Sequence, residues 1–92
     1  MLALGGAAAL VQLATAAASD QALVDQYCSA CHNDSAQTAG VSLQGLDPAQ
    51  PDLRPALWEK VLRKVASGEM PPSGLPAPDQ SARSEFVVRL ER

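Results

Sequence analysis

Aromatic residues, histidine and cysteine are all scarce in this sequence, and each shortage limits what the chain can form. Tyr27, Trp58 and Phe86 are the only aromatic side chains among 92 residues, so a single domain of this length buries a small core and needs further support. Cys28 and Cys31 provide little of it, because a disulfide that closes so short a loop removes little chain entropy. We therefore expect the support to come from something other than a disulfide.

An excess of basic charge is also absent. Seven Lys and Arg residues stand against ten Asp and Glu residues, which gives a net charge of −3. Domains that bind nucleic acid generally present a basic face, so this balance argues against a nucleic-acid partner. The sequence also offers no acid/base pair, activated nucleophile or cofactor-binding loop for independent catalysis. We therefore expect neither enzyme activity nor a small-molecule substrate from the chain alone.

The first 18 residues contain no charged side chain. They are mostly Ala, Leu, Gly and Val and end in three alanines, a pattern suited to signal-peptidase cleavage. We assign residues 1–18 to a signal peptide and residues 19–92 to one exported domain, periplasmic or otherwise outside the cytoplasm. Two alternatives stay open: a signal that is truncated at its start, because no Lys or Arg precedes the apolar run, and an uncleaved leader that anchors the protein in a membrane.

The remainder of the sequence predicts helices joined by loops, with no clean strand pattern, and therefore an all-α fold. The first helix is expected over residues 20–31, with Leu23, Tyr27 and Ala30 on one face. The segment 33–51 contains two Gly and two Pro residues and is expected to be a loop.

Two further helices are expected in the second half of the chain. Pro55 suits the first turn of a helix whose apolar residues follow the i, i+3, i+4, i+7 pattern, and Gly68 suits its end. The Pro-rich segment 70–76 interrupts the helical pattern. The last helix is expected to start near Pro78, with Asp79 in its first turn, and to run to the end of the chain.

Cys28-Ser29-Ala30-Cys31-His32 is a C-x-x-C-H motif, which is the signature of covalent c-type haem attachment. Each cysteine sulfur adds across one of the two haem vinyl groups, and the two residues between the cysteines let one helical turn span both vinyls. The next residue, His32, is then held under the iron as the proximal ligand. The motif predicts one covalent haem c, attached outside the cytoplasm where the leader would deliver the chain.

Three alternatives exist for these residues. A zinc site uses four N or S ligands, and two cysteines with one histidine are one ligand short. A thioredoxin-like C-x-x-C motif usually accompanies a βαβ pattern, of which this sequence shows no sign. A structural disulfide between Cys28 and Cys31 leaves His32 without a role.

Met70 is the expected second axial ligand. His32 is the only histidine, which excludes a second imidazole from this chain, and Met1 leaves with the signal peptide. Met70 lies in an irregular loop that Pro71 and Pro72 stiffen, whereas a Met that only fills the core normally lies in a periodic element. His/Met ligation raises the reduction potential and leaves no open site for oxygen or substrate, so it predicts electron transfer.

Apolar residues of the loop and of the second helix are expected to line the haem pocket. The Trp58 indole N–H is a candidate donor to a haem propionate, since a buried indole usually finds an acceptor. Arg54 or Arg63 is a candidate partner for a propionate, although either could simply be a solvated charge on a helix face. The expected pocket residues, most of which would belong to the core of any helical protein, are Leu43, Leu46, Trp58, Val61, Leu62 and Val65.

The sequence resembles class I cytochromes c and, more closely, the planctomycete-type cytochrome c domain. The segments that carry this resemblance are Tyr27–Asn33, Trp58–Val61 and Gly68–Pro72. The resemblance covers about residues 20–90. It implies a small fold of three main helices around a covalent haem, attached through both cysteines of the motif and ligated by its histidine and by the methionine of the last segment. It also implies that the first and last helices cross.

At this helix crossing many class I members have a glycine, where this chain has Asp20. The resemblance therefore suggests that Ala22 packs against Phe86 instead.

The leading functional hypothesis is an electron carrier that exchanges single electrons with redox partner proteins. The alternative is an electron-relay domain of a larger exported oxidoreductase, of which this chain is an N-terminal fragment fused to or docked on a catalytic domain. A haem sensor, in which Met70 leaves the iron and a gas binds, is a third hypothesis that the stiff Pro-Pro sequence disfavours.

Overall fold

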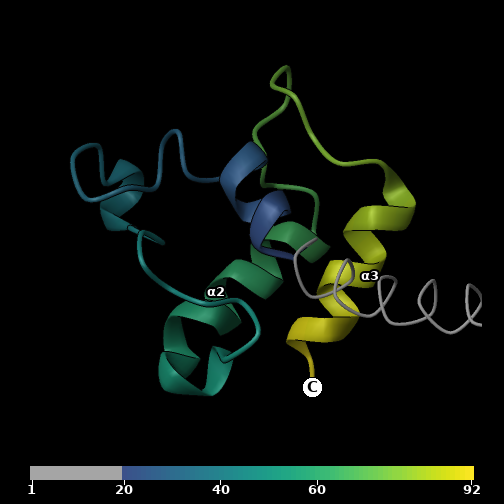
Figure 1. Cartoon of the computed structure of the whole chain (residues 1–92). Helices are drawn as coiled ribbons and strands as arrows, with labels where there is room; N and C mark the ends of the chain where they lie inside the picture. The colour runs from purple at the N-terminus through teal and green to yellow at the C-terminus, as the bar shows by residue number, and fades with distance from the viewer. Residues whose placement is uncertain (1–19) are drawn as a thin grey trace, which may run out of the picture.

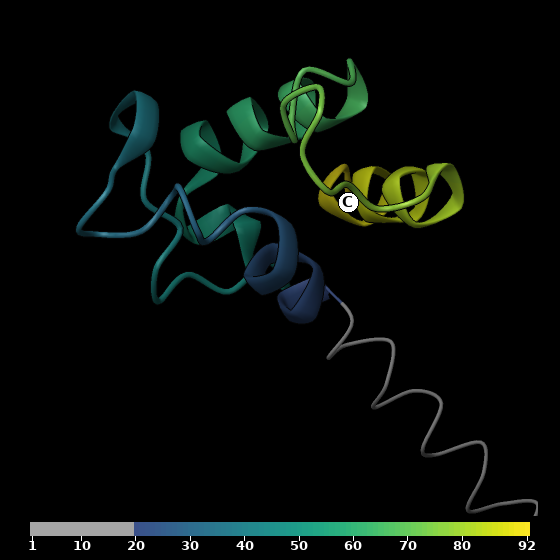
Figure 2. The ribbon, with the colours of Figure 1, turned by 90° about the horizontal axis from the view of Figure 1, so that it is seen from above.

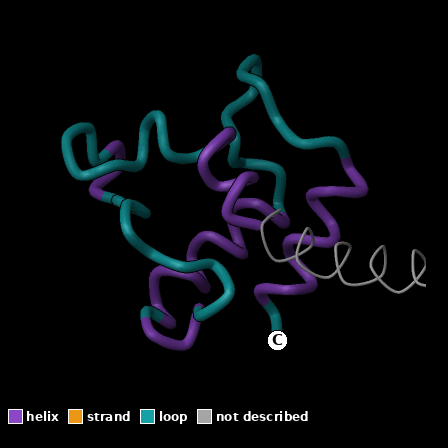
Figure 3. The backbone as a smooth tube through the Cα atoms, viewed as in Figure 1, coloured by secondary structure: helices purple, strands orange, loops and turns teal. Residues whose placement is uncertain are grey.

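The computed structural model describes residues 20–92. In this range the chain forms three α-helical segments and no strand (Figure 3), which confirms the predicted all-α class. The first helix covers residues 20–27, α2 spans Pro55–Ala66 and α3 spans Gln80–Leu90. Two single-turn 3₁₀ helices, η1 (Thr38–Gly40) and η2 (Pro51–Leu53), lie in the long segment between the first helix and α2.

The predicted signal peptide, residues 1–18, lies outside the described residues. Within residues 20–92, no helix has the length and apolar character needed to span a bilayer.

The first helix ends earlier than its sequence pattern predicts. It ends at Tyr27, and turns follow through the cysteine motif. The N–H groups of Cys28 and Ser29 both donate to the Val24 carbonyl, at 2.9 and 3.0 Å, so the regular i to i+4 ladder stops there. The expectation that Ala30 continues the helical face of Leu23 and Tyr27 is therefore wrong: Ala30 lies beyond the end of the helix and is exposed, and the helix buries Val24.

The boundaries of α2 follow the sequence closely. Pro55 occupies its first position, where a missing N–H costs no helical hydrogen bond. Gly68 follows the helix with φ +82°, a left-handed conformation that glycine adopts without the steric cost of a Cβ. Arg63 and Lys64 lie in the last turn, where their charges complement the negative end of the helix dipole.

Helix α3 starts at Gln80, two residues after the expected position at Pro78. Asp79 is the N-cap and not a first-turn residue: its carboxylate accepts a hydrogen bond from the Ala82 N–H at 2.8 Å. A carboxylate at this position satisfies an N–H that has no partner inside the helix. The helix ends at Leu90 and not at the last residue.

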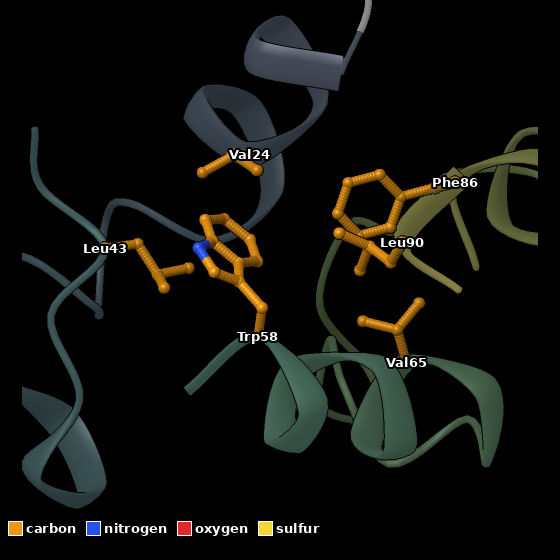
Figure 4. Packing of buried hydrophobic residues seen from close by; sticks show 6 residues of the cluster. All are labelled: Val24, Leu43, Trp58, Val65, Phe86 and Leu90. Carbon is orange, nitrogen blue, oxygen red and sulfur yellow. The ribbon is translucent and has the colours of Figure 1, made fainter. Parts of the chain in front are cut away.

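Trp58 lies at the centre of a small core. Figure 4 shows its indole between Val24 and Leu43 on one side and Phe86 and Leu90 on the other. Phe86 is fully buried, and Trp58 is 2 % exposed. Figures 1 and 2 agree that the first helix lies between the segment 31–50 and α3. The core therefore joins all three helices and the long loop.

An ion pair joins the first helix to α3. Asp20 is buried, and Arg89 approaches it with Nε at 2.8 Å from both carboxylate oxygens and Nη2 at 2.7 Å from Oδ1. Asp20 and Val24 are four residues apart and share the inward face, whereas Ala22 lies on the opposite side of the helix and is exposed. The expected packing of Ala22 against Phe86 is therefore wrong.

Replacing the buried carboxylate should destabilise the fold. Asp20→Asn keeps the shape of the side chain but removes the charge that the Arg89 guanidinium contacts. Because a hydrogen-bonded pair to a charged group contributes on the order of 1.5–3 kcal/mol and Arg89 is partly exposed, we expect a loss of about 1–2 kcal/mol in the free energy of unfolding. Chemical denaturation of the two proteins measures it.

Glu59→Gln is the matched control, because it removes one carboxylate from the exposed Glu59–Arg63 pair of α2. We expect this change to stay within about 0.5 kcal/mol of wild type. Equal effects of Asp20→Asn and Glu59→Gln would contradict a structural role for the Asp20–Arg89 pair.

Candidate functional site

The cysteine–histidine motif lies in the turns that directly follow the first helix. The Cys28 carbonyl accepts hydrogen bonds from the N–H groups of Cys31, at 3.3 Å, and His32, at 3.0 Å. This compact turn keeps the two thiols and the imidazole together on one short piece of chain. Both thiols are free: Cys28 is half-buried against the core, and Cys31 is exposed.

The His32 imidazole is oriented by the backbone. Its Nδ1 lies 3.3 Å from the carbonyl oxygen of Val41. A carbonyl oxygen only accepts hydrogen bonds, so in the neutral imidazole this contact places the proton on Nδ1 and leaves the Nε2 lone pair free. Histidines that bind metals generally donate their second ring N–H in this way. His32 therefore fits the proximal position of a haem iron through Nε2.

The loop after the motif folds back onto it. The Thr38 N–H donates to the Cys31 carbonyl at 3.0 Å, and the Leu43 N–H donates to the His32 carbonyl at 2.9 Å. Together with the bond from the imidazole to Val41, these contacts tie the loop to two consecutive residues of the motif. The long segment before α2 thus supports the histidine.

Met70 lies between α2 and α3, and both of its backbone polar groups are hydrogen-bonded. Its N–H donates to the Lys64 carbonyl at 3.1 Å, and its carbonyl accepts from Arg83 Nη1 at 2.9 Å. Its side chain is half-buried, and Pro71 and Pro72 follow. A methionine whose backbone is fixed on both sides fits a ligand that must be presented at a defined place.

The residue before Met70 is also anchored. The Glu69 carboxylate accepts hydrogen bonds from Ser67 Oγ at 2.7 Å and Lys64 Nζ at 3.0 Å. The Ser67 hydroxyl, and then Lys64, lower the pKa of Glu69 from its ordinary value. This exposed network connects the end of α2 to the methionine loop.

Comparison with known families identifies the domain. A family model described as Planctomycete cytochrome C matches residues 28–74, just over half of the chain. The match begins at Cys28 and includes His32, α2 and Met70. The chain belongs to the planctomycete cytochrome c family. No curated protein and no solved structure gives a significant match. Membership in a cytochrome c family indicates haem-based electron transfer as the role of this domain.

The apolar residues expected to line the haem pocket of this cytochrome c domain all belong to one cluster. Three of them are buried and three are half-buried, and Cys28 packs against the same cluster. The half-buried members keep part of their apolar surface exposed. The buried residues are Leu43, Trp58 and Val65, and the half-buried ones are Leu46, Val61 and Leu62.

The two arginines considered as propionate partners lie on the surface. Arg63 pairs with Glu59 at 3.1 Å, and both side chains are about two-thirds exposed. Arg54 is exposed and precedes α2. Neither arginine lies at a buried site for an anion. Both side chains fit the alternative interpretation, that of solvated charges on the surface.

A surface pocket of about 420 Å³ lies away from the cysteine motif, between η2, α2 and the end of α3. Trp58 and Leu62 line it, but neither cysteine of the motif, nor His32, nor Met70 does. Surface concavity therefore does not mark the candidate haem site of this cytochrome c domain. The site is identified by the donor atoms and by their hydrogen bonds.

The arrangement of the motif does not favour the three alternative chemistries. Among residues 20–92, no group of three or more His, Cys, Asp and Glu side chains gathers around one point as a zinc site needs. The same range contains no strand for a thioredoxin-like βαβ unit, and Cys28 and Cys31 are not joined as a disulfide.

Asn33 is a positioning residue that the sequence analysis did not identify. Its side-chain amide donates to the carbonyls of Ser29, at 2.8 Å, and Ala30, at 3.2 Å. Its Oδ1 accepts from the N–H groups of Ser35, at 3.0 Å, and Ala36, at 2.8 Å. Asn side chains commonly form such turns, and its place directly after the histidine was the available signal. Asn33 fixes where the chain leaves the motif.

The two cysteines should differ in reactivity when the thiols are free. Burial raises the pKa of the Cys28 thiol from 9.0 to about 11, so this group favours the folded state below pH 9 and loses that contribution as pH rises through 11. The thiolate is the nucleophile in alkylation. We expect iodoacetamide at pH 8 to label exposed Cys31 several-fold faster than Cys28, as peptide mass spectrometry measures.

A urea-unfolded sample is the control, and there both cysteines should react at similar rates. After haem attachment neither cysteine should react, because both sulfurs are then thioethers. Equal labelling of the two thiols in the folded haem-free chain would contradict the burial of Cys28.

Proposed function

We propose that the chain is an electron-transfer protein that binds one haem c covalently through Cys28 and Cys31, with His32 and Met70 as axial ligands. The observation that carries the proposal is the hydrogen bond between His32 Nδ1 and the Val41 carbonyl, because it leaves Nε2 available on the residue that directly follows Cys31 in a motif whose two thiols are free. A histidine with any other tautomer would present a proton, not a lone pair, at Nε2.

Met70 supports the proposal from the other half of the chain. Its N–H and carbonyl are both hydrogen-bonded, so its backbone is held in a defined position, as an axial ligand requires. When bound, the haem supplies one-electron chemistry, and a thioether ligand favours its ferrous state. His32 and Met70 would hold the iron from either side, and this ligation would leave no position for oxygen or substrate. We therefore propose that the chain is an electron carrier and not an enzyme.

The apolar cluster supports a haem that is largely shielded from water. Val61, Leu62 and Leu46 are half-buried against the core, and a porphyrin placed over them would complete their burial. Trp58 has no hydrogen-bond acceptor for its indole N–H among the described residues, and no fully buried polar side-chain atom there lacks a partner. The indole nitrogen, which points toward Leu43 in Figure 4, therefore keeps access to an acceptor such as a propionate.

The proposed partners and location follow from this chemistry. A carrier without a substrate exchanges electrons with redox proteins or with a catalytic domain that is fused to it or docks on it. Covalent attachment of the haem requires an exported chain, so we place the protein in the periplasm or otherwise outside the cytoplasm, anchored to a membrane if the leader is not cleaved.

Spectroscopy of the protein made in a host with haem-attachment machinery tests this proposal. We expect a pyridine haemochrome spectrum of a c-type haem at one per chain, and sharp α and β bands in the reduced protein. The oxidised protein should show the weak far-red band of an iron–sulfur bond. Met70→Ala should abolish that band and lower the reduction potential, because the thioether stabilises ferrous iron.

Leu75→Ala is the matched control, since Leu75 is an exposed apolar residue of the same loop and its loss should leave the far-red band unchanged. A far-red band that persists in Met70→Ala would exclude Met70 as the ligand. A colourless protein with free thiols would overturn the proposal as a whole.

A further inference from the structure

Arg83 of α3 uses its charged guanidinium to bind two backbone carbonyls and not a carboxylate. A single nitrogen, Nη1, donates hydrogen bonds to two backbone carbonyls, that of Val65 at 3.0 Å and that of Met70 at 2.9 Å. The side chain is half-buried. Hydrogen bonds from a charged donor are stronger than those between neutral groups, so both contacts hold their carbonyls firmly.

Arg83 has no carboxylate partner within residues 20–92. The ion pairs found there are Arg63 with Glu59, Lys64 with Glu69 and Arg89 with Asp20. A half-buried guanidinium normally pairs with an acid, and this one is satisfied by the backbone. Its position is therefore determined by the two carbonyls that it contacts.

The two carbonyls lie on either side of the corner between α2 and the methionine loop. Val65 is in the last turn of α2, where carbonyls lack helical partners, and its oxygen also accepts from the Gly68 N–H at 3.2 Å. The Met70 N–H returns to the Lys64 carbonyl at 3.1 Å. Through these two hydrogen bonds, Arg83 connects both sides of the corner to α3.

We propose that Arg83 is a positioning residue that holds Met70 in place as an axial ligand. The inference rests on Met70 being that ligand, as proposed above. Arg83 acts through the backbone of Met70 and does not contact the iron. Without it, the Met70 carbonyl loses its only protein donor among the described residues, and the loop gains freedom to move the sulfur away.

Competition with imidazole measures how firmly Met70 is held. Imidazole binds ferric haem iron only when the sulfur leaves, so a weaker hold on Met70 appears as a lower apparent Kd for imidazole. In the holoprotein, we expect Arg83→Met to lower this Kd about tenfold, which corresponds to about 1.4 kcal/mol. Arg83→Lys should lie between wild type and Arg83→Met, because an ammonium group retains N–H donors on a shorter side chain.

Arg89→Met is the matched control, because it removes the other arginine contact that α3 makes, the ion pair with Asp20, without touching the methionine loop. It should lower the melting temperature but leave the imidazole Kd within about twofold of wild type. If Arg89→Met lowers the Kd as much as Arg83→Met, the effect is general loosening of α3 and the proposal is overturned. The same conclusion follows if Arg83→Lys binds imidazole as tightly as Arg83→Met.

Met70→Ala separates this inference from the proposed function. If Met70 is the ligand, Met70→Ala should bind imidazole more tightly than any Arg83 variant. If wild type and Met70→Ala bind imidazole equally, the ligand assignment fails and the role of Arg83 fails with it. If they differ but Arg83→Met matches wild type, only the role of Arg83 is overturned.

Discussion

The bond between the His32 imidazole and the Val41 carbonyl is the contact on which the candidate site depends. It fixes the tautomer and the ring orientation at once, and it forms only because the loop after the motif folds back. The backbone bond between Leu43 and His32 holds the loop in that position, and Leu43 itself is buried in the core. The core therefore sets the orientation of the histidine through the loop.

Helix α3 connects the two parts of the site. At one point Arg89 pairs with Asp20 of the first helix, just ahead of the cysteine motif. At another point, Arg83 donates hydrogen bonds to the carbonyls of Val65 and Met70. Phe86, which lies between Arg83 and Arg89 in the sequence, is fully buried. The first helix, which leads into the cysteine motif, and the segment that carries Met70 thus both contact the same helix. The distance between the two proposed ligands, which come from distant parts of the chain, would depend on such a common support.

The small core explains why this domain suits a covalent group. Within residues 20–92, six apolar side chains form the buried cluster, Trp58 and Phe86 are its only aromatic members, and several apolar neighbours remain half-buried. A chain this short gains little further apolar burial from its own residues. A macrocycle bound through Cys28, which already packs against the cluster, would add apolar area where the chain cannot. This is consistent with the membership of the chain in a cytochrome c family.

The sequence by itself determined the elements with strong local signals. These elements depend only on neighbouring residues, and they are the C-x-x-C-H motif, the limits of α2 at Pro55 and Gly68, and the all-α class. The structure has α2 and the fold class as expected. Tertiary structure alone decided which side chains meet: Asp20 with Arg89, Arg83 with the Met70 carbonyl, and Val24 in place of Ala30 in the core. These contacts join residues far apart in the chain or depend on where a helix stops, and periodicity within one element carries no information about either.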